Sequence, residues 1–368
     1  MITLQIRAAF LSLIALAVAP TSGLAQPTIT ELTVPTAASG PYAIAAGPDG
    51  ALWFTETTAV GNKIGRITTA GVFTEYAIPT ASATAQAITA GPDGALWFTE
   101  IASSANKIGR ITTAGVITEY SVPTAAAFPW GITTGPDGAL WFCEFGVNKI
   151  GRITTSGSFT EYPVTTSSEP SYIVAGPDGA LWYGQLDARI GRITTSGSVT
   201  DYAVPSGSGT TGITVGPDGA LWFAEPYASK IGRITTAGAI TEYSVPSTAG
   251  SGPWVITNGP DGALWFSEIG PYVGRITTAG AVTTYQVPTT ASTANYGIAA
   301  GSDGALWFTE AANKIGRAAL STSSSGPGGG TGSGSTPATV PALSPAPLAA
   351  LALILLASGA LALRRSAA

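Results

Sequence analysis

The sequence predicts an all-β fold, a seven-bladed β-propeller with four strands in each blade. The motif G(P/S)DGALW occurs seven times, at intervals of 40 to 44 residues, which is the repeat length of propellers and solenoids. Each copy also holds four short apolar segments separated by turns, the content of one propeller blade. None of these segments has the 3.6-residue period of a helix, so an α-solenoid is excluded.

The first copy illustrates how the four strands are assigned. The segment "YAIAA" turns through "GPDG" into "ALWFTE", a loop leads to "KIGRITT", and "AG" turns into "VFTEYAIP". The Asp-Gly pairs belong to the hairpin turns, and the tryptophans of the seven "ALW" segments are expected to pack between blades. Cys143 takes a place that other copies give to Thr55 or Thr99, so we interpret it as a small, inert core residue.

The seventh copy ends at Leu320 without a fourth strand. The N-terminal part, however, contains one unassigned strand, "ITELTVP", from Ile29 to Pro35. We expect this segment to complete the seventh blade, because a closed ring removes the exposed edges of an open array.

Charged residues at fixed offsets predict a cross-strand register. A two-residue turn at Ala70-Gly71 would place Arg66 opposite Glu75, and the same arithmetic pairs Arg with Glu or Asp in four further blades. In the seventh blade Glu31 would face Arg317. Such exposed pairs contribute about 0 to 1 kcal/mol each, so their expected role is register rather than stability.

Both ends of the chain are expected to lie outside the propeller, which we place at residues 26–320. Residues 1–25 resemble a signal peptide, with Arg7 before an apolar run and small residues at 23 and 25. Residues 321–339 form a Ser/Gly/Pro-rich linker, and residues 340–368 a membrane anchor. The apolar stretch from Leu348 to Leu363, a single transmembrane helix, is closed by two arginines that would stay cytoplasmic. Its "VPALS" start resembles the IPTL-type sorting signals of exported bacterial proteins. The expected location is the membrane or cell surface of a bacterium.

Composition narrows the classes of function. The net charge of −5 argues against a nucleic-acid partner, which would require a basic surface. The chain has no histidine, so the commonest general base and metal ligand is missing. No spacing of ligands indicates a metal site, the lone cysteine forms no internal disulfide, and we expect a monomer.

The candidate site lies where the second strands end. Six copies have a glutamate there and the fourth has Gln185. By the hairpin arithmetic each of these residues faces the residue fourteen positions earlier, and that position varies: Tyr42, Gln86, Trp130, Ser171, Thr211, Trp254 and Tyr296. Variation on a uniform repeat is typical of a functional surface. We therefore expect carboxylates and aromatic rings around one mouth of the channel, with ligand-binding residues Tyr42, Glu56, Trp130, Glu144, Trp254, Glu268 and Tyr296.

Aromatic rings beside carboxylates suit a sugar, a peptide or another small molecule, including a cation. The alternative is a solvated rim, in which the glutamates pair with lysines of the neighbouring loops. A purely structural surface protein without a small ligand is a third possibility.

The segments "GPYAI", "GALWFTE", "NKIGRITTAG" and "ITEYSVPT" resemble the virginiamycin B lyase family from about Ile29 to Arg317. The resemblance implies a seven-bladed propeller that opens a cyclic depsipeptide antibiotic by Mg-assisted elimination, with a histidine as base. Of six family site positions, Tyr42 and Glu310 are retained. The base histidine falls on Tyr296 and its companion on Trp254, while an acidic residue and a tryptophan fall on Ala294 and Ile269.

The missing histidines favour binding over catalysis. A tyrosine has an ordinary pKa of about 10 and makes a poor base near neutral pH. If the chain is a divergent lyase, Glu310 is the expected catalytic residue, and Mg would be the cofactor only in that case.

Overall fold

The structure is a computed structural model that describes residues 26–164, 168–246, 252–289 and 295–320. The predicted signal peptide, linker and anchor, and Ala294, lie outside these residues. No helix in the described part of the chain is long and apolar enough to cross a membrane.

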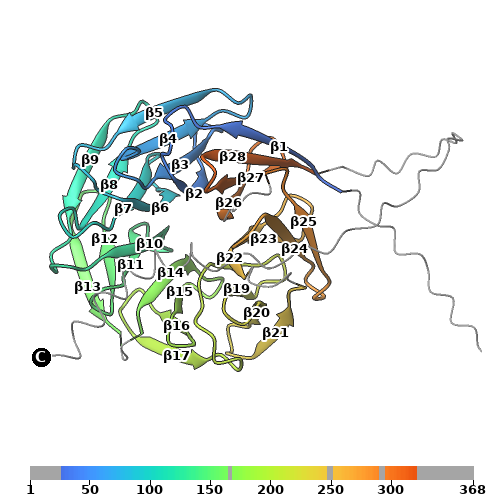
Figure 1. Cartoon of the computed structure of the whole chain (residues 1–368). Coiled ribbons are helices and arrows are strands. Elements are labelled where there is room, and N and C mark those ends of the chain that lie inside the picture. Colours follow the sequence, from blue (N-terminus) through green and yellow to red (C-terminus); the bar gives the residue numbers. More distant parts are fainter. Residues whose placement is uncertain (1–25, 165–167, 247–251, 290–294, 321–368) are drawn as a thin grey trace, which may run out of the picture.

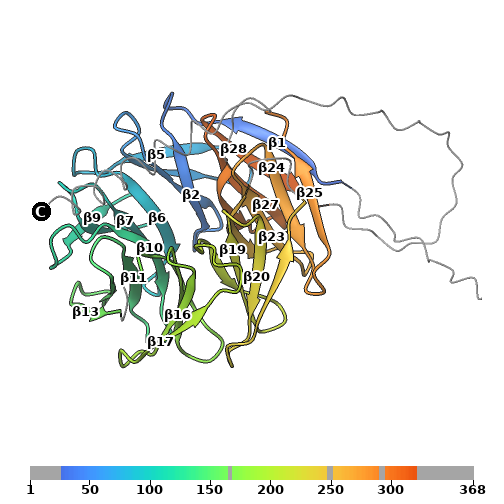
Figure 2. The same ribbon diagram turned by 60° about the horizontal axis from the view of Figure 1, so that its bottom comes forward.

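Seven four-stranded antiparallel sheets surround one axis, which confirms the seven-bladed propeller (Figures 1 and 2). Blades 1 to 3 contain β2 Pro41–Ala46, β3 Leu52–Glu56, β4 Lys63–Ile67 and β5 Phe73–Ala77; β6 Ala85–Ala90, β7 Leu96–Glu100, β8 Lys107–Ile111 and β9 Ile117–Ser121; β10 Pro129–Thr134, β11 Leu140–Glu144, β12 Lys149–Ile153 and β13 Phe159–Pro163. Blades 4 and 5 contain β14 Pro170–Ala175, β15 Leu181–Gln185, β16 Arg189–Ile193 and β17 Val199–Ala203; β18 Ile213–Val215, β19 Leu221–Glu225, β20 Lys230–Ile234 and β21 Ile240–Ser244. Blade 6 contains β22 Pro253–Asn258, β23 Leu264–Glu268, β24 Tyr272–Ile276 and β25 Val282–Gln286.

Blade 7 contains β26 Asn295–Ala300, β27 Ala305–Glu310 and β28 Lys314–Ala319, and its fourth strand is the N-terminal β1 Thr28–Thr33. Strand β1 pairs antiparallel with β28 along its whole length, next to it in Figure 1. The predicted closure of the ring by the first strand is therefore confirmed.

The core lies between neighbouring blades, as predicted for the tryptophans. Trp53 is fully buried and packs on Ile88, Leu96 and Phe98 of the next blade. On the other face of β3, the outer end of the Phe54 ring lies against Gly65, where a side-chain carbon would lie 2.1 Å from Phe54 Cζ. Cys143 is fully buried in the core between blades 3 and 4, and burial raises the pKa of its thiol.

The predicted register between the third and fourth strands is wrong by one residue. Gly65, not Arg66, pairs with Glu75, and Glu31 likewise pairs with Gly316 rather than Arg317. The turn has three residues instead of two: the Thr68 amide donates to the Val72 carbonyl, and Gly71 adopts a positive φ of 86°. The extra residue moves every side chain of the fourth strand by one position.

The arginines instead bind the turn aspartates. Arg66 Nε donates to Asp49 Oδ2 over 2.7 Å, and Trp53 Nε1 donates to Asp49 Oδ1 over 3.0 Å. Burial alone would raise the pKa of Asp49, but the hydrogen bonds from Trp53 and Arg66 outweigh it and lower the pKa. All seven blades repeat this Asp–Trp–Arg contact, so the aspartates do more than form turns.

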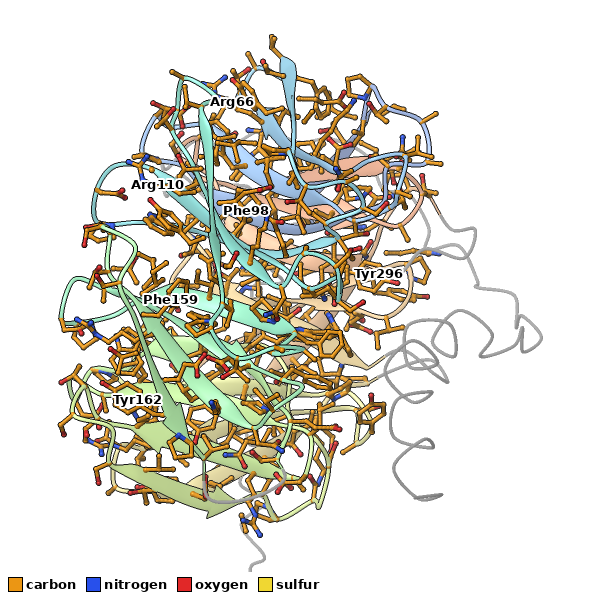
Figure 3. The ribbon with its side chains drawn as sticks, turned by 90° about the vertical axis from the view of Figure 1, so that its left-hand side faces the viewer. Arg66, Phe98, Arg110, Phe159, Tyr162 and Tyr296 are labelled. Atoms are coloured by element: carbon orange, nitrogen blue, oxygen red, sulfur yellow. The ribbon has the colours of Figure 1, made fainter. Side chains whose placement is uncertain are left out.

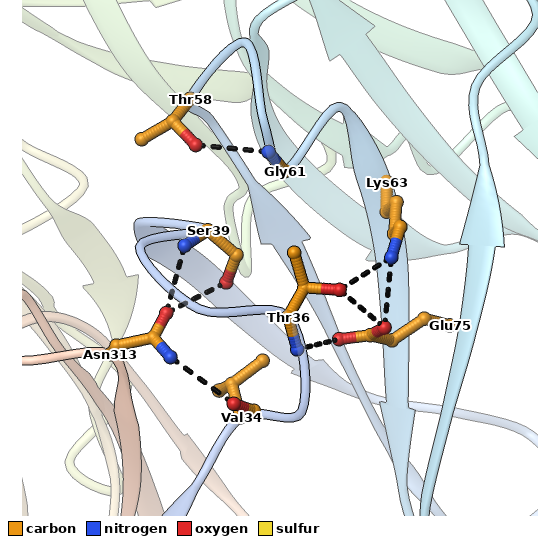
Figure 4. A network of polar contacts seen from close by, with 8 residues as sticks. All are labelled: Val34, Thr36, Ser39, Thr58, Gly61, Lys63, Glu75 and Asn313. Atoms are coloured by element: carbon orange, nitrogen blue, oxygen red, sulfur yellow. Dashed lines mark hydrogen bonds and ion pairs between the residues drawn. The ribbon is translucent and has the colours of Figure 1, made fainter.

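The fourth-strand acids bind lysines and the loops between blades. Glu75 accepts from Lys63 Nζ over 2.9 Å and from both the amide and the hydroxyl of Thr36, which lies in the loop entering the blade (Figure 4). Asn313 of blade 7 bonds the same loop. Its side-chain oxygen accepts from the amide and the hydroxyl of Ser39, and its side-chain nitrogen donates to the Val34 carbonyl. These contacts fasten the closing strand to the first blade.

Candidate functional site

The candidate site is the end of the propeller axis at which the first strands begin. Here β2 and the corresponding strands of blades 2, 3, 4, 6 and 7 contain a bulge, in which two residues oppose one on the second strand. The expected pairing of residue 42 with residue 56 is therefore wrong: Glu56 pairs with Pro41, and Tyr42 and Ala43 lie within the bulge. A bulge redirects side chains, which allows the bulge residues of several blades to point toward the axis.

Hydroxyl groups hold these bulges in place between blades. Thr55 Oγ1 accepts from the Ala43 amide over 3.0 Å, and Thr309 Oγ1 donates to the Tyr42 carbonyl over 2.6 Å. Thr309 belongs to the preceding blade, so each inner strand is positioned by its own sheet and by its neighbour. Gly297 permits the close approach, because a side-chain carbon there would lie 2.7 Å from the Tyr42 carbonyl oxygen.

Five aromatic side chains from five blades meet at this end of the axis: Tyr42, Trp130, Tyr172, Trp254 and Tyr296. We call them the axial cluster. The rings of Tyr42 and Tyr296 stack at a centroid distance of 4.7 Å, and Trp254 Nε1 donates to the Tyr42 hydroxyl over 3.2 Å. Tyr42 is buried and the other four are half-buried. Figure 3 shows Tyr296 toward one face of the ring and Arg110, from the turn end of its blade, toward the other.

The Tyr172 hydroxyl lies near the Tyr42 hydroxyl and the indole groups of Trp130 and Trp254. The Trp130 Nε1 atom is buried and has no hydrogen-bond partner among the described residues. Burial, followed by the contact with Tyr172, raises the pKa of Tyr42 well above its ordinary value. Burial also raises the pKa of Tyr296. All three tyrosines of the axial cluster are thus neutral hydroxyls at neutral pH.

Sequence reasoning missed Tyr172 and selected Ser171 instead. In the structure Ser171 is buried and donates to the carbonyls of Gly184 and Thr210, away from the cluster. A signal was present in the sequence, because the other six blades have Ala, Gly or Val at the position of Tyr172. The bulge explains the miss, since it brings both of its residues close to the axis.

The second-strand acids form a separate, buried layer. Glu56, Glu144 and Glu310 are 0% exposed and Glu268 is 1% exposed, so these carboxylates do not form a solvated rim. Their lysine neighbours bind the fourth-strand acids instead, as Lys314 does with Glu31 over 2.6 Å. The structure therefore places the predicted glutamates inside the blades, and it brings together all four predicted aromatic residues: Tyr42, Trp130, Trp254 and Tyr296. The ligand-binding role of these aromatic residues and glutamates stays a prediction.

Glu310, the predicted catalytic residue, is buried beside Lys314 and Glu31. Burial, with a smaller contribution from the charge of Glu31, raises the pKa of Glu310 to about 7. Mg²⁺ prefers several oxygen ligands at one point. Among the described residues no three acidic, cysteine or histidine side chains are grouped in that way, and Glu31 is already bound by Lys314 and Thr289. The residues around Glu310 thus do not fit a Mg site.

Comparison with known proteins agrees with this architecture. The family model described as the virginiamycin B lyase family matches residues 24–169 and 164–324. The structure of a virginiamycin B lyase from Staphylococcus aureus is 42% identical over 80% of this chain and 99% of its own, with a TM-score of 0.75.

Two further solved structures are similar. A streptogramin B lyase is 38% identical over 80% of this chain and 98% of its own, with a TM-score of 0.76. A catalytically inactive histidine-to-alanine variant of the Staphylococcus aureus lyase, solved with quinupristin, is 41% identical over 80% of this chain and 99% of its own, with a TM-score of 0.75. With its seven closed blades and a family match over most of the described residues, the chain belongs to the virginiamycin B lyase family.

Proposed function

We propose that this chain is an exported, membrane-anchored propeller that binds a small molecule, sugar or peptide at the axial cluster, without the histidine-based elimination of its lyase relatives. One observation carries the proposal: the position that the resemblance assigns to the base is Tyr296, whose ring stacks on Tyr42. The relative from Staphylococcus aureus is inactive when a histidine is replaced by alanine, and this chain has no histidine at all.

The polar groups of the axial cluster favour a ligand with hydrogen-bond acceptors. Two indole N–H groups and two tyrosine O–H groups meet there. Trp254 donates to Tyr42, whereas Trp130 Nε1 is buried without a hydrogen-bond partner among the described residues. When Tyr42 donates to Tyr172, the proton of the Tyr172 hydroxyl has no acceptor within the pair. A carbonyl or ether oxygen of a peptide or sugar satisfies that donor, and the half-buried rings contact its apolar part.

The N–H and O–H donors of the axial cluster also disfavour a cationic ligand. A cation would require a face of carboxylates, and the six glutamates are buried inside the blades. Aromatic faces alone attract a cation, by about 0.5 to 2 kcal/mol, but the N–H and O–H groups of the axial cluster would repel it.

Quinupristin provides a direct test, because it is a ligand of a lyase relative. Residues 26–320 are incubated with quinupristin and Mg²⁺. Ring opening by elimination gives a linear isomer of the same mass, so the compound is followed by liquid chromatography with fragmentation mass spectrometry, and its binding by tryptophan fluorescence. We expect binding with the ring intact. Appearance of the linear product would overturn the binding-only function.

A divergent lyase is the second candidate, and the raised pKa of Glu310 supports it. A pKa of about 7 suits a general base near neutral pH. If turnover is observed, Glu310→Gln should abolish it. Turnover that persists in this variant would remove Glu310 from the reaction.

A further inference from the structure

The six second-strand glutamates form a layer whose chemistry the binding site does not use. The carboxylate oxygens of Glu56, Glu100, Glu144 and Glu310 are buried, and none has an aligned hydrogen-bond partner in the described part of the chain. A buried, ionised carboxylate without hydrogen bonds is strongly unfavourable. Each of these groups also lies near a second carboxylate on the fourth strand, such as Glu119 beside Glu100.

Blade 4 contains a natural substitution that shows what the position requires. Gln185 replaces the glutamate, and its Nε2 donates to Asp201 Oδ1 over 2.8 Å. Asp201 pairs with Gly191, as Glu31 of blade 7 pairs with Gly316. A side-chain carbon added to Gly191 would lie 2.6 Å from Gln185 Nε2, and one added to Gly316 would lie 2.8 Å from Glu310 Oε1. The side-chain amide of Gln185 and the carboxyl group of Glu310 therefore occupy equivalent places in their blades, each above the glycine of its own third strand.

An amide that donates to a carboxylate has the hydrogen-bonding character of a protonated carboxyl group. Five blades have both a second-strand glutamate and an acid on the fourth strand. We propose that their buried second-strand glutamates, Glu56, Glu100, Glu144, Glu225 and Glu310, are neutral carboxylic acids that donate toward this fourth-strand carboxylate, and that they make the propeller less stable as the pH rises. The fourth-strand acid keeps its charge, because lysine and a loop hydroxyl bind it, as Lys107 and Thr80 bind Glu119.

The charged groups that face these five glutamates are of the same kind. Glu100 faces Glu119 and Lys107, and the other four are arranged alike: Glu56 with Glu75, Lys63 and the Ser39 hydroxyl; Glu144 with Glu161 and Lys149; Glu225 with Glu242, Lys230 and the Ser206 hydroxyl; Glu310 with Glu31 and Lys314. Burial is the largest cause of the raised pKa in all five. The pKa is raised to about 8 for Glu100 and Glu144 and to about 7 for Glu56, Glu225 and Glu310.

The direction of the pH dependence follows from linkage. The folded pKa lies above the unfolded value of 4.5, so between these values the folded state binds a proton that the unfolded state has released. The stabilisation of the folded state by the protonated glutamate is complete below the unfolded pKa, and it is lost as the pH rises through the folded pKa. The fourth-strand acids act oppositely, since the pKa of Glu119 is lowered and its contribution is lost on acidification.

The test uses a reciprocal pair of variants in the propeller, residues 26–320. Glu100→Gln places in blade 2 the residue that blade 4 already has, and Gln185→Glu does the reverse. Denaturant unfolding is measured from about pH 5 to about pH 9. Glu100→Gln should remove one proton from the pH dependence, which is about a tenfold smaller change in the unfolding constant per pH unit between about pH 5 and pH 7. Gln185→Glu should add one proton.

An infrared measurement on the unaltered protein keeps the proposal testable if a variant fails to fold. Neutral carboxyl groups absorb separately from carboxylates, so at neutral pH we expect a protonated-carboxyl band that disappears on raising the pH to about 9 and weakens in Glu100→Gln. Absence of this band, or an identical pH dependence in Glu100→Gln and the unaltered protein, would overturn the proposal.

Discussion

At the face that carries the G(P/S)DG turns, all seven blades use the same Asp–Trp–Arg contact, whereas at the opposite end of the axis only five blades supply a tyrosine or tryptophan to the axial cluster. The turn contact lies within one blade, so each copy can repeat it without reference to the others. The cluster joins blades 1, 3, 4, 6 and 7, so each residue has its own neighbours. Uniform residues thus mark what each blade needs for folding, and varied residues mark what only the whole ring can form.

Deleting the closing strand should have the largest effect, because the structure at both ends of the axis depends on a closed ring. Deletion of residues 28–33 exposes the edge of β28 and removes Glu31 from its contacts with Lys314 and Thr289. We expect aggregation and loss of cooperative unfolding, measured by size-exclusion chromatography and thermal circular dichroism. A monomeric deletion variant with an unchanged melting temperature would refute the role of β1.

A change at the turn end should affect stability and not ligand binding. Asp93→Ala removes the acceptor of the Trp97 indole and the partner of Arg110. The unsatisfied buried donor and the lost ion pair should together cost about 2 to 3 kcal/mol of unfolding free energy. Asp93→Asn, which keeps an acceptor for Trp97, is the matched control and should cost less. Asp218→Ala should destabilise the protein as Asp93→Ala does, because Asp218 accepts from Trp222 and Arg233.

A change in the axial cluster should affect binding more than folding. Trp254→Ala removes an aromatic contact and the donor to Tyr42, and we expect quinupristin to lose about 1 to 3 kcal/mol of binding free energy by fluorescence titration. Tyr227→Ala, which truncates an exposed aromatic residue outside the cluster, is the control. Equal affinity in both variants would place the ligand elsewhere.

The smallest expected effect belongs to a single hydroxyl. Tyr172→Phe keeps the ring but removes the donor that the cluster leaves unused, so quinupristin should lose about 0.5 to 1.5 kcal/mol of binding free energy. The variant should also unfold more easily than the unaltered protein, because the buried Tyr42 hydroxyl loses its acceptor. If Tyr172→Phe binds as tightly as the unaltered protein, the ligand does not use this donor.

Much of the fold could be predicted because its signals are local and repeated. The seven motifs gave the number of blades, and the incomplete last copy together with the segment at Ile29 predicted the closing strand. The aromatic positions Tyr42, Trp254 and Tyr296 could be found because they differ among otherwise uniform copies. Trp130 could be found in the same way; its ring centroid lies 5.1 Å from that of Phe145.

The sequence by itself determined the propeller, its closure and the absence of a histidine base, since these depend on composition and on patterns within one repeat. Only the tertiary structure decided the register of the fourth strand, the bulge that admits Tyr172 to the axis, and the burial of the glutamate layer. The physical reason is that turns of two and three residues have the same sequence signature, yet they differ by one full step in which side chains face each other. Burial is likewise set by the neighbouring blade, so a glutamate that reads as a surface acid becomes a buried acid only when the ring is assembled.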